Sequence, residues 1–216
     1  MRLKILYDND AEGGFRKGWG FSCLVGEELL FDTGADPSIL LSNMRRFDVE
    51  LGRIRKIFLS HEHGDHVGGV QILERLGRIK VFVPSSFSSR LKEWLKSHPN
   101  AELVETTAKQ EICHGMFTTG DLGNGLKEQS LIVQTKNGLT VVTGCSHPGL
   151  ENILRLASKF GEIYGVIGGF HGFDSLEVLK ERRLILPCHC TTHKKEILSL
   201  YPESTVKCSA GCEVEI

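Results

Sequence analysis

The sequence predicts an α/β protein that forms a single domain. Apolar runs of strand length alternate with amphipathic runs of helix length over residues 1–100, and strand-like runs dominate residues 101–143. The chain has 216 residues, of which 40% are hydrophobic and 25% charged. That length suffices for one well-packed core and is short for two independent ones. We therefore expect one domain over residues 1–216.

Composition and charge narrow the class of partner. The formal net charge is −1 and like charges do not cluster, so the basic patch that nucleic acids require is not indicated. Residues 1–8 alternate like a strand, and no apolar run has the length of a signal-peptide core or a membrane span. We expect a soluble, cytoplasmic protein that acts on a small molecule and binds neither nucleic acid nor membranes. The sequence leaves the oligomeric state open.

The first half of the chain alternates strands with helices. Asp36 and Pro37 are a favourable N-cap and first helical residue, so they predict the start of the first helix. A polar, glycine-rich loop over residues 8–18 carries Arg16 and Lys17, which could meet an anionic substrate. The expected strands are residues 1–8, 19–25, 28–34, 56–59 and 79–83, and the expected helices are residues 36–47, 65–77 and 85–98.

The second half begins with strands. Asn137-Gly138 is a strong hairpin signal between two of them. We expect strands at residues 102–105, 111–118, 129–135, 139–143, 163–167 and 183–187, and helices at residues 150–160, 174–181 and up to residue 200. Two last strands, near residues 205–207 and 213–216, are expected to close the second sheet.

The stretch from Leu59 to Gly69 is the centre of the functional prediction. His61, His63, Asp65 and His66 lie within six residues, between a strand-like run and a helix-like run. Such a loop points neighbouring side chains in different directions, so His61 and His63 can bind one metal while Asp65 and His66 bind a second. Nitrogen and carboxylate ligands suit zinc, iron or manganese.

This H-x-H-x-D-H motif resembles the signature of the metallo-beta-lactamase superfamily. Five further motifs extend the resemblance to the subgroup labelled dihydropterin-ribofuranosylaminobenzene-phosphate synthase-like: Trp19-Gly20-Phe21-Ser22, Asp32-Thr33-Gly34, Gly144-Cys145-Ser146-His147-Pro148-Gly149, Gly168-Gly169-Phe170-His171 and His189-Cys190-Thr191. The resemblance implies an αββα sandwich, with two mixed β-sheets between outer helices and one or two metals at a sheet edge. It implies little about the substrate.

The resemblance also implies roles for residues outside the histidine motif. Asp32 matches an aspartate that orients the metal-binding loop without binding metal. Cys145 occupies the place of an aspartate that bridges two metals, and His147 is expected to complete the first metal's ligands. Asp121 is the alternative candidate for the bridging aspartate.

One more histidine is needed for the second metal. We prefer His189 to His171 as this ligand. His171 is then expected to contact a substrate phosphate or to transfer a proton. The expected cofactors are two divalent metals, with zinc preferred. At a separation of about 3.5–4 Å, they could share a hydroxide that hydrolyses the substrate. Asp65 would steer its proton.

Two other functions stay open at this stage. The same fold with iron could perform redox chemistry or a phosphoribosyl condensation, and a metal-stabilised binding module would show no turnover. Hydrolysis of a small phosphorylated or ester-type substrate is the prediction we favour.

The seven cysteines are interpreted as reduced thiols, because a chain with a good core does not need disulfides. Two clusters could instead form a structural zinc site or a disulfide: Cys188-His189-Cys190 and Cys208 with Cys212.

Overall fold

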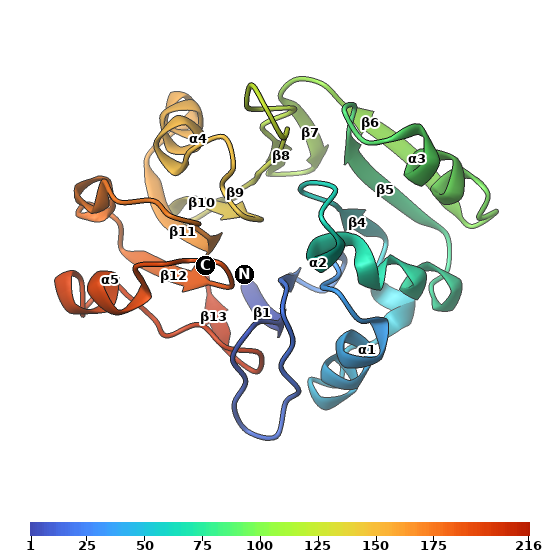
Figure 1. Ribbon diagram of the computed structural model, residues 1–216, viewed down its shortest axis with the longest axis horizontal. Coiled ribbons are helices and arrows are strands. Elements are labelled where there is room, and N and C mark those ends of the chain that lie inside the picture. Colours follow the sequence, from blue (N-terminus) through green and yellow to red (C-terminus); the bar gives the residue numbers. More distant parts are fainter. The chain divides into compact units, whose positions relative to one another are not determined.

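The structure, a computed structural model, describes residues 1–216 and divides into two compact units. The first comprises residues 1–106 and 209–215, and the second comprises residues 107–208 and residue 216. Each unit is built on one mixed β-sheet with helices packed against it (Figure 1). Whether the units fold as one domain stays a prediction.

The first unit contains a seven-stranded sheet in the order β13-β1-β2-β3-β4-β5-β6. Strands β13, β1, β2 and β3 pair antiparallel, whereas β3, β4, β5 and β6 pair parallel. The strands are β1 Arg2–Tyr7, β2 Ser22–Val25, β3 Leu29–Phe31, β4 Lys56–Phe58, β5 Ile79–Pro84, β6 Ala101–Thr106 and β13 Glu213–Glu215. The prediction placed the last of these in the second sheet, which is wrong, because Glu213–Glu215 pairs with β1.

Helices cover one face of this sheet (Figure 1). Helix α1 (Pro37–Arg46) begins as predicted, with the Asp36 carboxylate accepting the Ser38 N–H at 2.7 Å. Helix α3 (Ser89–Lys96) starts four residues later than expected, after its N-cap Ser88. A short 3₁₀ turn, η1, spans Leu51–Arg53. Leu40, Met44 and Leu95 pack from these helices against the core of the sheet.

The segment after the histidine motif differs from the predicted α-helix. It forms one α-turn, α2 (Gly64–Val67), and then a 3₁₀ helix, η2 (Gly68–Arg75). The Gly69 N–H donates to Gly34 O at 2.9 Å, which removes it from the helical hydrogen-bond pattern. Gly68 and Gly69 also lie so close to the Ala35 and Thr33 carbonyls that no side chain would fit. Tight packing on the Asp-Thr-Gly loop therefore shapes this helix.

The second unit contains a six-stranded sheet in the order β12-β11-β10-β9-β8-β7. Strands β10, β11 and β12 pair parallel, and β7 to β10 pair antiparallel. The strands are β7 Gln110–Cys113, β8 Met116–Thr118, β9 Leu131–Thr135, β10 Gly138–Thr143, β11 Ile163–Gly169 and β12 Leu184–Cys188. The Asn137-Gly138 hairpin is confirmed. The single strand expected over residues 111–118 is two strands, because the chain turns at Gly115, whose φ is 72°.

Helix α4 (Leu150–Ala157), continued by the 3₁₀ turn η3 (Ser158–Phe160), and α5 (Lys194–Leu200) pack on this sheet (Figure 1). The α-helix predicted over residues 174–181 is only a 3₁₀ turn, η4 (Leu176–Leu179). Leu176 and Leu179 are both buried, and three residues per turn place them on one side. Residues 205–207 form no strand, although Thr205 makes a single bridge to Ile185. None of the helices has the length and apolar character needed to cross a membrane.

Candidate metal centre

In the first unit, the candidate residues follow two parallel strands at their carboxyl ends. Asp32 comes directly after β3, and the histidine motif comes after β4. The carboxyl ends of neighbouring parallel strands meet at the same edge, where ligands of open α/β sheets gather. The Thr33 N–H and hydroxyl both donate to His66 O, at 2.8 and 2.9 Å, and hold the two loops together.

Asp32 forms hydrogen bonds to the histidine loop. Its side chain is fully buried, and its Oδ1 accepts the Ser60 N–H at 2.7 Å. Its Oδ2 lies 2.7 Å from both Ser60 Oγ and His66 Nδ1. Ser60 Oγ in turn lies 2.9 Å from His61 Nδ1. If each Nδ1 carries the proton for these hydrogen bonds, Nε2 is the metal-binding nitrogen of both His61 and His66.

Neighbouring donors of the motif lie close together, and the His61 ring is near both His63 and His66, with centroids 4.7 and 4.2 Å away. His61 Nε2 and His63 Nδ1 lie 3.1 Å apart. Two nitrogens bound tetrahedrally to one zinc at 2.0–2.1 Å would lie about 3.3 Å apart. His66 Nε2 and Asp65 Oδ2 are 3.8 Å apart, and form a second pair of donors. The donors of this loop are of the types that zinc binds, and the spacing of His61 and His63 fits a shared zinc.

In the second unit, the candidates follow three parallel strands. Cys145 and His147 come after β10, His171 after β11 and His189 after β12. The loops are connected, since the Thr192 N–H donates to His171 O at 2.9 Å. His189 is 3% exposed, whereas His171 is an exposed side chain whose ring centroid lies 5.3 Å from that of His147.

The cysteine and histidine donors of this unit form a compact group. Ligand atoms of Cys145, His189 and Cys190 all lie within 4.8 Å of one another. Asp121, the rival to Cys145, lies in the loop before Glu128 and belongs to no group of three neighbouring ligand atoms. Sequence reasoning included Cys145 and His189 among the expected ligands of the two metals, and considered Cys190 only for a structural zinc site or a disulfide.

Glu128 is the main residue that sequence reasoning missed. Its side chain is fully buried, and its carboxylate accepts four backbone N–H groups of the loop that carries Cys145 and His147. Oε1 accepts from Gly144 at 2.9 Å and from Cys145 and Ser146 at 3.0 Å. Oε2 accepts from His147 at 2.9 Å. Glu128 thus orders the ligand loop of the second unit, as Asp32 does in the first.

Backbone strain is concentrated at these loops. Four of the five non-glycine residues with positive φ are Asp32 (48°), Ser146 (60°), His171 (48°) and His189 (44°), and the fifth is Asp48 (52°). Each left-handed residue of this kind costs of order 1–3 kcal/mol and persists only where its surroundings hold it. Such residues cluster at functional sites, which supports a functional reading of these loops.

The prediction that all the cysteines are reduced is wrong. Cys188 and Cys208 form a disulfide, with their Cα atoms 5.2 Å apart and a sequence separation of 20. The bond ties the end of β12 to the last segment of the second unit. It also separates the two thiols of Cys188-His189-Cys190, since only Cys190 belongs to the group with His189.

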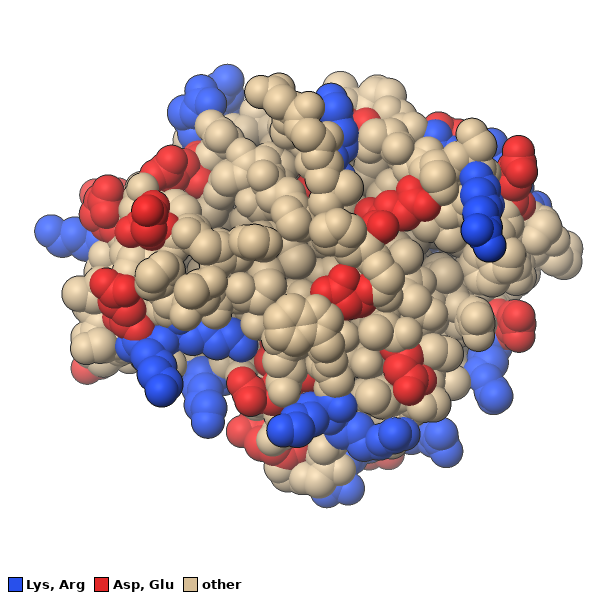
Figure 2. Space-filling view, in the orientation of Figure 1, with Lys and Arg blue, Asp and Glu red and all other residues tan.

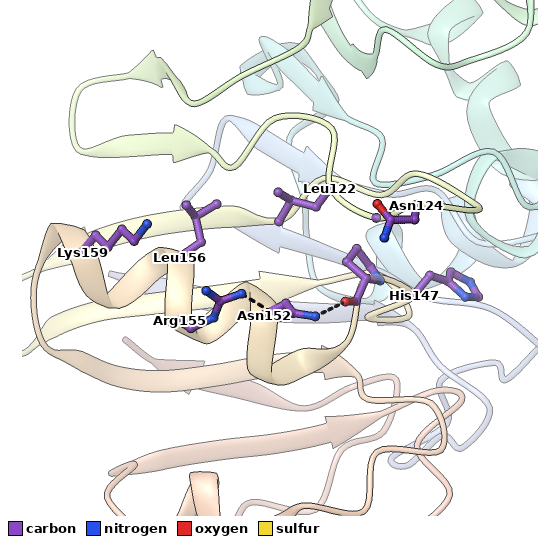
Figure 3. Close-up of a pocket in the computed structure, with 9 residues that line it drawn as sticks. Leu122, Asn124, His147, Asn152, Arg155, Leu156 and Lys159 are labelled. Atoms are coloured by element: carbon purple, nitrogen blue, oxygen red, sulfur yellow. Dashed lines mark hydrogen bonds between the residues drawn. The ribbon is translucent and has the colours of Figure 1, made fainter.

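A cavity of about 320 Å³ adjoins His147 in the second unit (Figure 3). Arg155 and Lys159 extend along one side of it, and the Arg155 guanidinium donates to Asn152 Oδ1 at 2.9 Å. Asn152 Nδ2 donates to Pro148 O at 2.8 Å, which connects Arg155 to the loop of His147. Neither Arg155 nor Lys159 forms an ion pair with a carboxylate.

Arg16 and Lys17, the other basic residues considered for substrate binding, are exposed. Their loop is anchored to α1 by Asn43, which accepts the Arg16 N–H at 2.8 Å and donates to Arg16 O at 2.7 Å. Their role in binding stays a prediction.

Buried histidines and carboxylates at the ends of parallel strands in an α/β fold define a candidate metalloprotein. The family model described as "Metallo-beta-lactamase superfamily" matches residues 23–147, more than half of the chain. The protein belongs to this superfamily.

Two proteins of Methanocaldococcus jannaschii are similar over most of their length. An uncharacterized protein, MJ0448, is 28% identical over 235 aligned positions, which cover 89% of this chain and 91% of the relative. A protein named 7,8-dihydropterin-6-methyl-4-(beta-D-ribofuranosyl)-aminobenzene-5'-phosphate synthase is 28% identical over 229 positions, which cover 80% of this chain and 78% of the relative. The second agrees with the subgroup that the motifs resemble.

Solved structures confirm the predicted metallo-beta-lactamase-type fold. Tm1679, described as a metal-dependent hydrolase of the beta-lactamase superfamily, has a TM-score of 0.82 at 28% identity, covering 100% of this chain and 99% of the other. The short form of human tRNase Z has a TM-score of 0.61 at 17% identity, covering 100% and 99%, and shows the fold alone.

Proposed function

We propose that this protein is a metal-dependent hydrolase that acts on a small phosphorylated or ester-type substrate. The observation that carries the proposal is the buried network in which Asp32 orients His66 directly and His61 through Ser60. A carboxylate behind a histidine fixes the ring and raises its basicity as a metal ligand. A fold similar to that of Tm1679, itself described as a metal-dependent hydrolase, supports the reaction class.

The proposed ligands form two sets, and zinc is the proposed metal because it accepts nitrogen, oxygen and sulfur donors. The first divalent ion takes His61, His63 and His147, the second takes Asp65, His66 and His189, and Cys145 serves in place of a bridging aspartate. His61 and His63 donors 3.1 Å apart, and His66 and Asp65 donors 3.8 Å apart, are consistent with each pair sharing an ion.

A bound divalent cation would lower the pKa of a water ligand from that of bulk water toward about 7 and would polarise the electrophilic oxygen of a substrate. The chain's residues then move protons and bind substrate. Asp65 is the proposed acceptor of the proton, because its carboxylate lies beside His66 and is partly exposed. His171 is the second catalytic candidate, because its exposed ring beside His147 can donate to a substrate oxygen.

The residues that line the cavity beside His147 favour the binding of an anionic substrate. Arg155 and Lys159 bring two positive charges that no carboxylate neutralises, and a guanidinium suits the geometry of a phosphate. Elsewhere Lys and Arg are mixed with Asp and Glu on the face shown in Figure 2, which favours a small molecule over a nucleic acid. We also propose a cytoplasmic location for the protein.

The double variant His63→Ala/His66→Ala tests the proposal. We expect it to lose bound metal and hydrolysis together, measured by elemental analysis and on a panel of p-nitrophenyl phosphate, bis-p-nitrophenyl phosphate and p-nitrophenyl acetate. His114→Ala, an exposed histidine between β7 and β8, is the matched control and should retain both. A double variant that still hydrolysed the panel would refute the proposal.

A non-hydrolytic metalloenzyme is the alternative, since one relative is named a synthase. It predicts a metal-loaded protein that is inactive on the panel, and an iron-containing, coloured protein would favour the redox form. A binding module predicts retained metal without any turnover.

A further inference from the structure

We propose that Cys190 is a metal ligand and that Cys145, His189 and Cys190 form a thiolate-rich site for a borderline-soft divalent cation, with zinc as the expected ion. The inference deepens the proposed function, because it adds a ligand and changes the character of the site. It rests on that function only for the presence of a metal.

The spacing of the three donors fits one cation. Their ligand atoms lie within 4.8 Å of one another. Zinc binds sulfur at about 2.3 Å and nitrogen at about 2.0–2.1 Å, so two sulfurs in a tetrahedral site lie about 3.8 Å apart. A shift of about an ångström or less, within reach of a rotation of each cysteine side chain, therefore brings the set to bonding distance.

The backbone after β12 sets the direction of Cys190. His189 has a φ of 44°, in the left-handed region, and reverses the chain between the two cysteines. The Thr191 N–H and hydroxyl donate to Cys188 O at 3.1 and 2.7 Å, and Thr191 Oγ1 accepts the Phe170 N–H at 3.0 Å. This turn leaves Cys188 to its disulfide with Cys208 and places Cys190 with Cys145 and His189.

Gly169 provides the space that Cys190 occupies. A Cβ at this position would lie 2.7 Å from Cys190 Sγ and 3.3 Å from Cys145 Cα, so any larger residue would displace the thiol. The Gly169 N–H donates to Gly144 O at 3.0 Å, which places β11 directly beside the loop of Cys145. The end of β11 therefore brings the two thiols close together.

The chemistry of the group favours a cation over plain packing. Cys145 and His189 are each 3% exposed, and a bound divalent cation would offset the negative charge of buried thiolates. Binding would release the two thiol protons. Two sulfurs and one nitrogen select zinc over manganese, which prefers oxygen ligands.

Cobalt substitution of the full-length protein tests the inference. Bound thiolates give cobalt a charge-transfer absorption that histidine and carboxylate ligands do not. We expect Cys190→Ser to lose about half of this band per chain, as one of two thiolates is removed, and to bind zinc at least about tenfold more weakly in chelator competition. Cys145→Ser should lose a similar share, and Cys113→Ser, a half-buried cysteine of β7 outside the group, should match the wild type.

The outcomes separate this inference from the proposed function. A Cys190→Ser band equal to that of the wild type, with the metal retained, overturns the inference and leaves the hydrolase proposal intact. Failure of the wild-type protein to bind any divalent metal overturns both. If Cys190→Ser does not fold, the sulfur count around zinc from X-ray absorption of the wild-type protein decides, and a count that requires only one thiolate per chain overturns the inference.

Discussion

Glu128 offers the sharpest test of how the second unit holds its ligand loop. In Glu128→Gln, the amide oxygen can replace Oε1 and accept from Gly144, Cys145 and Ser146, but the NH₂ group then faces the His147 N–H. One charge-assisted hydrogen bond becomes a contact between two donors. Hydrogen bonds to charged groups contribute about 1.5–3 kcal/mol each, so we expect a loss of about 2–3 kcal/mol in the free energy of unfolding.

Glu128→Ala leaves all four N–H groups without the carboxylate. Because water can enter the space left behind and the four bonds act together, the loss should be about 4–5 kcal/mol, well short of four separate bonds. For a chain of this size, 1 kcal/mol corresponds to about 2–4 °C, so thermal unfolding should shift down by roughly 4–12 °C in Glu128→Gln and further in Glu128→Ala.

Differential scanning calorimetry measures these shifts. Glu151→Gln, the same chemical change at an exposed glutamate of α4, is the matched control and should change stability by less than about 1 kcal/mol. Amide hydrogen exchange of the four loop N–H groups gives a local readout, which should accelerate in both Glu128 variants. A Glu128→Gln protein that melts with the wild type and keeps its loop amides protected would refute the reasoning.

Three further predictions concern Asp32, Cys212 and the disulfide. Asp32→Asn turns an NH₂ donor toward either His66 Nδ1–H or the Ser60 donors, so zinc affinity in chelator competition should fall by about 10–100-fold; unchanged affinity would count against the role of Asp32. Burial, aided by the Glu12 and Asp8 carboxylates, raises the pKa of Cys212 from 9.0 to about 11. Between those pH values the folded state binds more protons than the unfolded state, so stability falls as pH rises, by roughly 2–3 kcal/mol; alkaline titration of unfolding should show a smaller loss in Cys212→Ser. Cys208→Ser should unfold about 3 kcal/mol more easily than the oxidised wild type, and dithiothreitol should remove this difference.

Local patterns in the sequence were sufficient to predict the parts of the site that lie close together along the chain. Each of two polar loops, His61 to His66 and Asp32-Thr33-Gly34, directly follows an apolar strand. The sequence could therefore predict that both loops lie at the same edge of the sheet. Glu128 could not be inferred in this way. It lies 16 residues before Gly144 and 19 before His147, in a polar segment that reads as an ordinary loop. The sequence shows only a polar run, Glu128-Gln129-Ser130, before β9, and its complete burial is evident only in the fold.

The remaining errors have two physical sources. An apolar pattern cannot separate 3.0 from 3.6 residues per turn over two turns, so the 3₁₀ character of η2 and η4 was missed. Pairings between distant segments are not encoded locally. Cys188 pairs with Cys208, and β13 pairs with β1. Both pairings depend on the path of the chain in three dimensions, which the spacing of residues along the sequence does not determine.

With the roles proposed for His171 and His189, chemistry and folding stability would compete at these two positions. His171 and His189 have backbones that asparagine or glycine would adopt with less strain, so their side chains come at the expense of the stability of their own loops. A library of variants selected only for heat resistance should therefore lose histidine at these two positions while keeping the core. Such a selection, run without any substrate, would show at which of these positions histidine is unfavourable for stability.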